Sequence, residues 1–201
     1  MKKFLPALRG IRAGARNKDG AAAVEFAMLL PIMITLFFGT VETSLALLCR
    51  ADVSIMASTA ADLISQASTT STTDISNVYA AAGTVLYPYY SGGASGKPTI
   101  RLTSVIYDST AGNPATTGKV AWSCTQSGTG TLTPTSRSAG GAVTFSQGLM
   151  TASGSVIMAE IAYSYDSPTT KVITGSINMT NNFYTKPRRV AQIPSPTGGC
   201  P

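Results

Sequence analysis

The sequence has no histidine and few charged side chains. None of its 201 residues is histidine, and charged residues make up 12% of the chain. Without histidine, a protein lacks the commonest general base and metal ligand and cannot form a Ser-His-Asp or Cys-His arrangement. Only nine residues are acidic, and those outside the long apolar segment share no catalytic spacing. We therefore expect no catalytic residue, no cofactor and no metal, and a membrane-anchored enzyme is the least supported class of function.

Basic residues are concentrated at the N-terminus. Six of the fifteen lysines and arginines precede Gly20, and the acidic residue in that tract is Asp19. A basic tract before an apolar segment stays on the cytoplasmic side of a membrane, so the residues beyond Arg50 are expected outside the cytoplasm. Because the tract is not followed by a groove-like pattern of basic and aromatic residues, we expect no nucleic-acid partner.

A long apolar segment follows the basic tract. Between residues 21 and 48 the ionisable side chains are Glu25 and Glu42. As a helix, these twenty-eight residues would be roughly 42 Å long, which is enough to cross a bilayer. The segment is also longer than the apolar core of a secretory signal. We therefore predict a transmembrane helix over residues 21–48, with a membrane as partner.

The helical pattern continues beyond the predicted membrane segment. Apolar residues recur at steps of three and four as far as Ile64, with polar residues largely opposite. A run of serines and threonines from Ser68 should end the helix because their hydroxyls compete for backbone hydrogen bonds. The pattern predicts a stem over residues 49–68 whose helix reaches about Gln66. Pro31 removes one helical hydrogen bond and predicts a kink or a loosened turn.

The junction between the basic tract and the apolar segment has an unusual composition. Gly20 is followed by four small residues, and Glu25-Phe26 comes next. A protease that cuts at the cytoplasmic face of a membrane needs a residue without a side chain, and Gly20 meets that need. In a helix that begins at Ala21, the carboxylate of Glu25 would complement the positive end of the helix dipole and a free amine, its own or a neighbour's.

This block resembles the processing site of type IV pilin-like precursors, most closely the TadE-like pseudopilins of tight-adherence (Tad/Flp) pili. The resemblance covers about residues 17–48 and includes Pro31 and the sequence Gly39-Thr40-Val41-Glu42. A weaker match is Lys186-Pro187-Arg188-Arg189, where family members often have Arg-Pro-Arg.

The resemblance implies cleavage between Gly20 and Ala21 by a prepilin peptidase, with residues 1–20 as the leader. It also implies a role for Glu25, Pro31 and Glu42 in assembly with other pilins, pseudopilins and the inner-membrane pilus assembly machinery. An uncleaved signal anchor, in which Glu25 merely lies at the interface, is the alternative.

Residues 69–201 are numerous enough to form a head domain with its own core. We predict a second helix over residues 74–87, starting at Asp74. Alternating side chains predict strands over residues 99–107, 119–125, 155–165 and 171–180. Residues 126–154 are ambiguous between a loop and edge elements, and Glu160 is expected on a solvated strand face. The predicted fold is α+β and pilin-like, with a small antiparallel sheet packed on the long N-terminal helix.

The chain has three cysteines, and the predicted periplasmic location permits disulfides. We predict a Cys124–Cys200 bridge that attaches the C-terminal tail to the sheet, with two free thiols as the alternative. Cys49 lies on the apolar stripe of the stem and is expected to be a buried free thiol.

A cation site in a loop is a further possibility, at Asp108 with Asn113 or at Asp166. Aspartates in such turns, however, usually accept hydrogen bonds from backbone amides.

Two functions fit these expectations. The first is a minor pseudopilin of a Tad-type pilus that takes part in pilus assembly, priming or adhesion, in the bacterial inner membrane or a surface pilus. The second is an uncleaved single-pass protein, similar to TadG, whose periplasmic head binds a partner or a surface. Cleavage after Gly20 distinguishes the two.

Overall fold

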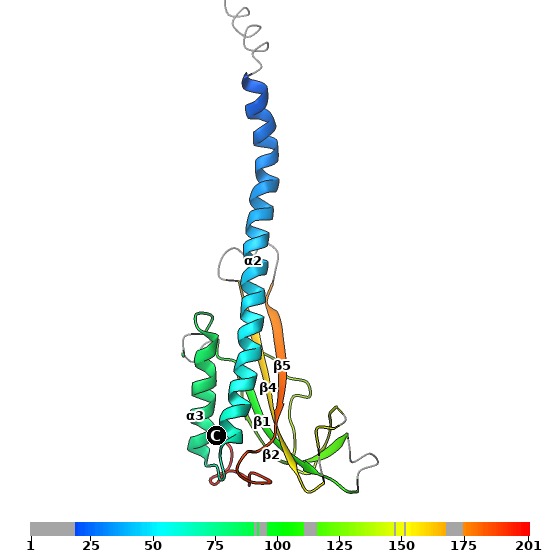
Figure 1. Cartoon of the computed structure of the whole chain (residues 1–201). Coiled ribbons are helices and arrows are strands. Elements are labelled where there is room, and N and C mark those ends of the chain that lie inside the picture. Colours follow the sequence, from blue (N-terminus) through cyan, green and yellow to red (C-terminus); the bar gives the residue numbers. More distant parts are fainter. Residues whose placement is uncertain are drawn as a thin grey trace, which may run out of the picture.

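The computed structural model describes residues 19–90, 92, 96–110, 116–146, 148–150, 152–167 and 175–201. A long helix, α2, begins the described chain, and a head of one further helix and a sheet is gathered around its C-terminal half (Figure 1). Most of the basic leader predicted at residues 1–20 lies outside the described residues.

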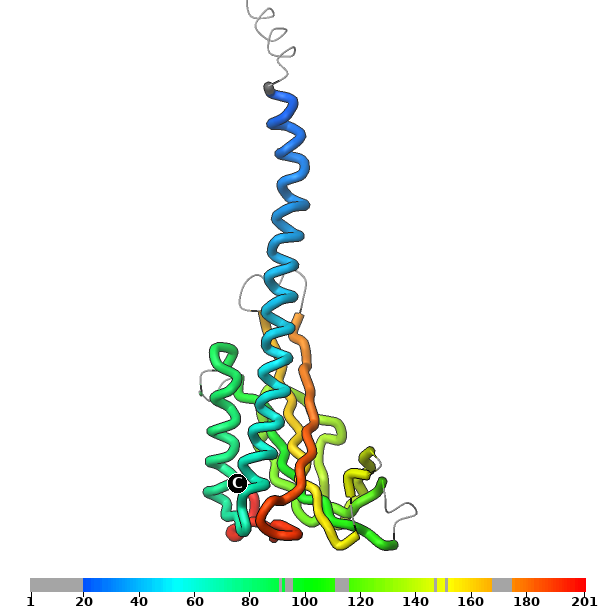
Figure 2. Tube along the Cα trace, viewed as in Figure 1, coloured from blue at the N-terminus to red at the C-terminus, as the bar shows by residue number. Residues whose placement is uncertain are grey.

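Helix α2 spans Asp19–Ser65 without interruption. Its end agrees with the predicted end near Gln66. Pro31 lies inside the helix, and the Thr35 hydroxyl donates to the Pro31 carbonyl at 2.8 Å. The helix therefore continues through the proline, as Figure 2 also shows.

Helix α3 spans Thr72–Gly83 and is followed by the short 3-10 helix η1, Thr84–Leu86. The predicted start at Asp74 was late, because Ser71 is the N-cap and Asp74 completes a capping box with it. The Ser71 amide donates to the Asp74 carboxylate at 2.9 Å, and the Asp74 amide donates to the Ser71 hydroxyl at 3.2 Å. Hydrogen bonds from the Ser71 side chain and amide lower the pKa of Asp74.

A five-stranded antiparallel sheet forms the second layer, with strand order β3-β2-β1-β4-β5. Its strands are β1 Thr99–Tyr107, β2 Thr117–Gln126, β3 Ala142–Thr144, β4 Ser155–Tyr165 and β5 Ile177–Thr185. The α+β, pilin-like prediction is confirmed. Strand β3 comes from the segment that the sequence left ambiguous.

The last strand differs from its prediction at residues 171–180. Strand β5 begins at Ile177, which pairs with Tyr165, the last residue of β4. Because its pairing with β4 begins at Ile177, the observed strand lies closer to the C-terminus than the predicted one and ends at Thr185. Residues 171–174 of the predicted strand lie outside the described residues.

The main core lies between the sheet and the two helices. It joins the buried stripe of α2 to one face of the sheet, and Ile75, Tyr79 and Ala82 add the buried face of α3. The Trp122 indole donates to the Ile193 carbonyl at 3.0 Å, so the C-terminal tail closes one side of this core. The predicted stripe of the stem faces this core through Cys49, Val53, Met56, Ala60 and Ile64. Leu48 and Leu63, which the same spacing placed on the stripe, are exposed.

Residues 127–137 cover part of the other face of the sheet. Gly130 accepts a hydrogen bond from the Thr99 hydroxyl at 2.6 Å, and the Gly128 amide donates to the same hydroxyl at 2.8 Å. A side chain at Gly130 would meet the Ala162 backbone at 2.2 Å, so a glycine is needed there.

The expectation that Glu160 faces solvent was wrong, because its side chain is 1% exposed beneath this cover. Its carboxylate accepts from Arg101 Nε at 2.7 Å and from Arg137 Nε at 2.8 Å. Burial by itself would raise the pKa of Glu160, but the hydrogen bonds from Arg137 and Arg101 outweigh it and lower that pKa. Alternation along a strand could not reveal this, since both faces of the sheet are covered.

The C-terminal tail is attached to both layers of the head. Cys124 and Cys200 form the predicted disulfide, with Cα atoms 5.1 Å apart. At the end of α2, the Arg188 amide donates to the Ser65 carbonyl at 2.9 Å, and its guanidinium pairs with Asp62. The tail therefore fixes the sheet against the far end of the stem.

Candidate assembly and processing site

The N-terminal part of α2 stands clear of the head. Every residue from 20 to 37 is exposed, and burial begins at Phe38 and Gly39. These eighteen residues are about 27 Å long as a helix, close to the roughly 30 Å of a bilayer core. Among the described helices, α2 is long and apolar enough to cross a membrane, with a mean hydropathy of 2.1. This apolar helix indicates a membrane anchor or a signal sequence.

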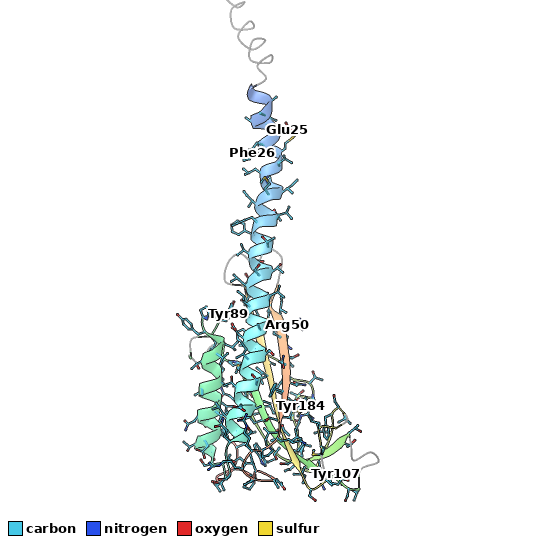
Figure 3. The ribbon with its side chains drawn as sticks, in the orientation of Figure 1. Glu25, Phe26, Arg50, Tyr89, Tyr107 and Tyr184 are labelled. Atoms are coloured by element: carbon cyan, nitrogen blue, oxygen red, sulfur yellow. A yellow bond between two sulfur atoms is a disulfide. The ribbon has the colours of Figure 1, made fainter. Side chains whose placement is uncertain are left out.

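The predicted processing residues lie together at the exposed end of α2. Gly20 is the second residue of the helix, and the space around it is open, since a Cβ added there would have no atom within 4 Å. Ala21 and Glu25 are four residues apart and so lie on the same side of the helix. Glu25 and Phe26 both project from the free helix (Figure 3). No part of the described head covers this end.

Glu42 has a different environment from Glu25. Its side chain is 1% exposed, and its carboxylate accepts a hydrogen bond from the Ser167 hydroxyl at 3.1 Å. Ser167 follows β4, so the head reaches α2 within the segment predicted to span the membrane at residues 21–48. The structure therefore separates the two acids, with Glu25 on the free helix and Glu42 at the contact with the head.

A cluster of three tyrosines from the head contacts α2 at Leu45, just beyond Glu42. The Tyr89 hydroxyl donates to the Leu45 carbonyl at 3.1 Å, and the Tyr163 hydroxyl donates to the Tyr89 carbonyl at 3.0 Å. The rings of Tyr89 and Tyr165 meet edge to face with centroids 5.7 Å apart. Burial raises the pKa of Tyr163 and Tyr165. These contacts join positions far apart in the sequence, which is why sequence patterns did not reveal them.

Cys49 is the described free cysteine, and it is buried as predicted. Burial, and secondarily the charge of Asp52, raises the pKa of its thiol to about 11. The thiol is therefore protonated at neutral pH, and it behaves as a small apolar side chain.

The possible cation sites gain no support from the described residues. Asp108 accepts hydrogen bonds from the Thr110 amide at 2.9 Å and the Thr110 hydroxyl at 2.6 Å. These bonds lower the pKa of Asp108. The carboxylate thus stabilises the local turn, as aspartates in turns commonly do. Asn113 lies outside the described residues. In the described part of the chain, no three metal-ligating side chains come together.

The comparison with protein families matches the helix described above. Residues 20–62 match the family model of the TadE-like proteins, and this range covers nearly all of α2. No curated protein and no solved structure matches the chain. The chain is therefore similar to the TadE-like proteins over residues 20–62, the segment that forms the long N-terminal helix.

Proposed function

We propose that the protein is a minor pseudopilin of a Tad-type pilus, anchored by α2 and processed by a prepilin peptidase after Gly20. The observation that carries this proposal is the TadE-like match over residues 20–62, which coincides with a helix whose first eighteen residues stand free of the head. A free apolar helix can first hold the subunit in the membrane and then pack against other subunits. The head, bound to the lower half of α2, would take part in assembly, priming or adhesion.

Cleavage after Gly20 would create a new amine close to Glu25. The amine would belong to Ala21, four residues before Glu25 and on the same side of the helix. A carboxylate in the first turns of a helix is also stabilised by the helix dipole. Cleavage would therefore leave an apolar helix with one carboxylate near its end, available for docking in the assembly. Pro31 lies in this free segment as well, whereas Glu42 would act by holding the head to the helix.

The alternative is an uncleaved single-pass protein whose head binds a partner, similar to TadG. One observation favours a binding role for the head, namely a hollow of about 530 Å³ between α3 and the start of β1. Its lining includes Tyr79, Tyr87 and Tyr90. The two functions differ in the N-terminus of the mature protein, so cleavage decides between them.

The test is mass spectrometry of the N-terminal peptide of membrane-extracted protein, from cells with and without the prepilin peptidase. We expect Ala21 as the first residue when the peptidase is present and an intact leader when it is absent. Gly20→Leu should block cleavage, and Gly14→Leu, a glycine substitution inside the leader, should not. Protein that retains the leader in cells with an active peptidase would contradict the proposal and favour the TadG-like function.

A further inference from the structure

The hollow between α3 and the start of β1 has the size of a small-molecule site. Its volume is about 530 Å³, within the usual range of ligand pockets. In Figure 1, α3 stands on the side of α2 away from β5. None of the described residues that line the hollow belongs to α2. The hollow is therefore separate from the candidate processing site on the free helix.

Three tyrosines give the hollow an aromatic lining. Tyr79 of α3 is 3% exposed and belongs to the main core, whereas Tyr87 is 72% exposed. The ring of Tyr90 lies beside Gly83, because a Cβ added to Gly83 would be 3.2 Å from a carbon of that ring. The three rings thus range from the core to the solvent, and a ligand in the hollow would pack against aromatic surface.

The polar groups of the lining are uncharged. Ser76 of α3 contributes a hydroxyl, and Gln126, the last residue of β2, contributes an amide. Both groups can donate as well as accept hydrogen bonds. Among the described residues that line the hollow, none is acidic or basic. A charged ligand would therefore find no counter-charge in this lining, which favours a neutral ligand that carries hydroxyls.

One polar atom of the lining residues is buried without a partner. The hydroxyl of Tyr79 is buried and has no hydrogen-bond partner in the part of the chain that the structure describes. Nearly all buried polar groups in proteins have such a partner, because an unpaired one keeps the full cost of its desolvation. A hydroxyl of a bound ligand would remove that cost.

We propose that the hollow binds a neutral pyranose saccharide, which packs against the ring of Tyr87 and places one hydroxyl at the hydroxyl of Tyr79. The face of an aromatic ring is electronegative, so the C–H groups on the flat face of a pyranose pack well against it. The sugar hydroxyls both donate and accept, as Ser76 and Gln126 do. Proline-rich segments also bind aromatic-lined grooves, but proline has no N–H to donate. The inference goes beyond the proposed function, because the hollow is on the head and binding there does not depend on cleavage of the leader.

Isothermal titration calorimetry of the full chain tests the proposal, in a detergent without a sugar headgroup. The neutral probes are maltotriose, cellotriose and the trimer of N-acetylglucosamine, and sialyllactose is the charged comparison. We expect at least one neutral trisaccharide to bind with a Kd below about 1 mM. Sialyllactose should bind at least tenfold more weakly, because the lining offers no counter-charge. If none of the neutral trisaccharides binds, or if sialyllactose binds as tightly as they do, the proposal is overturned.

A matched pair of variants on α3 shows whether the saccharide binds in the hollow. Ala80 and Ala81 are both exposed, and Ala80, unlike Ala81, is among the described lining residues. Ala80→Phe should fill the hollow and lower the affinity at least tenfold. Ala81→Phe makes the same change one residue farther along and should leave the affinity unchanged. Equal affinities of the two variants would overturn the site.

Two tyrosine variants test the two contacts of the saccharide. Tyr87→Ala removes an exposed ring and should lower the affinity at least tenfold. Phe183→Ala, which removes a ring that is 40% exposed on β5, is the matched control and should bind as the wild type does. Tyr79→Phe removes the unpartnered hydroxyl alone, so it should lower the affinity at least threefold without lowering the urea midpoint. Wild-type affinity in either tyrosine variant would overturn the contact that it removes.

A proline-rich peptide distinguishes the saccharide from the other ligand that suits an aromatic lining. We expect decaproline neither to bind nor to displace the trisaccharide. If decaproline binds, the trisaccharides do not, and Ala80→Phe abolishes peptide binding, the saccharide proposal is overturned in favour of a peptide. The proposed function is unaffected by that result, because it is tested by the N-terminus of the mature protein.

Discussion

The two parts of α2 differ in composition and in surroundings, although both contain long apolar runs. Residues 20–37 are exposed on all sides, whereas beyond Gly39 one side of the helix forms the core of the head. The acids show the same contrast, since Glu25 is exposed and Glu42 is buried against Ser167. An apolar run by itself therefore does not tell which part meets lipid and which part meets protein. The head makes that division, and it does so several residues before the end of the predicted membrane segment at residue 48.

The strongest test of this contrast removes the exposed acid. We expect Glu25→Ala to be processed normally but to lose pili, because under the proposed function the carboxylate docks the free helix in the assembly. Immunoblotting for processed protein and electron microscopy of pili would check both parts. Wild-type piliation would show that the carboxylate is incidental.

The second prediction concerns the disulfide that attaches the tail to the head. Cys200→Ser should lower the free energy of unfolding by about 4–5 kcal/mol, since the bridge closes a loop with a sequence separation of 76. Urea unfolding of the detergent-solubilised protein can be followed by the fluorescence of Trp122, the single tryptophan, which is buried. Wild-type protein treated with a reductant is the control and should show a similar loss. Unchanged unfolding would mean that the bridge contributes little.

The third prediction concerns the buried ion cluster on the far face of the sheet. Glu160→Gln should destabilise the protein by about 3–5 kcal/mol, because the buried Arg101 would lose its counter-charge. The pKa of Glu160 is lowered in the folded state. Its contribution is therefore complete above the unfolded pKa and is lost as the pH falls through the folded pKa.

Unfolding at several pH values would check this contribution. The difference in stability between wild type and Glu160→Gln should shrink at acidic pH. A difference that does not change with pH would argue against an ionised Glu160 in the folded protein.

The smallest predicted effect concerns the contact between Ser167 of the head and Glu42 of α2. Ser167→Ala removes the hydrogen bond to Glu42 and should cost roughly 0.5–1.5 kcal/mol, the usual range for an intramolecular hydrogen bond. Urea unfolding would measure it, with the exposed Ser109→Ala as the control. A loss no larger than that of the control would mean that other contacts hold the head in place.

The sequence allowed much of the fold to be predicted. The long helix and its buried stripe, three strands and the disulfide were predicted from spacing and composition, because these features depend on neighbours in the chain. The N-cap of α3 and the start of β5 were misplaced. Ser71 is the N-cap of α3, and Asp74, which was predicted to start the helix, instead completes the capping box three residues later. Strand β5 begins only where its pairing with β4 begins.

The candidate site also contains residues that the sequence could identify and a contact that it could not. Gly20, Ala21, Glu25 and Phe26 are close in sequence, and one helix brings them together whatever the rest of the chain does. The bond between Ser167 and Glu42 joins residues 125 positions apart. No local pattern reports such a contact.

By itself, the sequence determined an apolar helix with a basic tract before it, because hydrophobic length and charge act locally. Only the tertiary structure decided which acid is exposed, which is buried, and how the far face of the sheet is covered. The reason is that burial depends on chain segments that are distant in sequence. For Glu42 and Glu160, those segments are the end of β4 and the loop that carries Arg137.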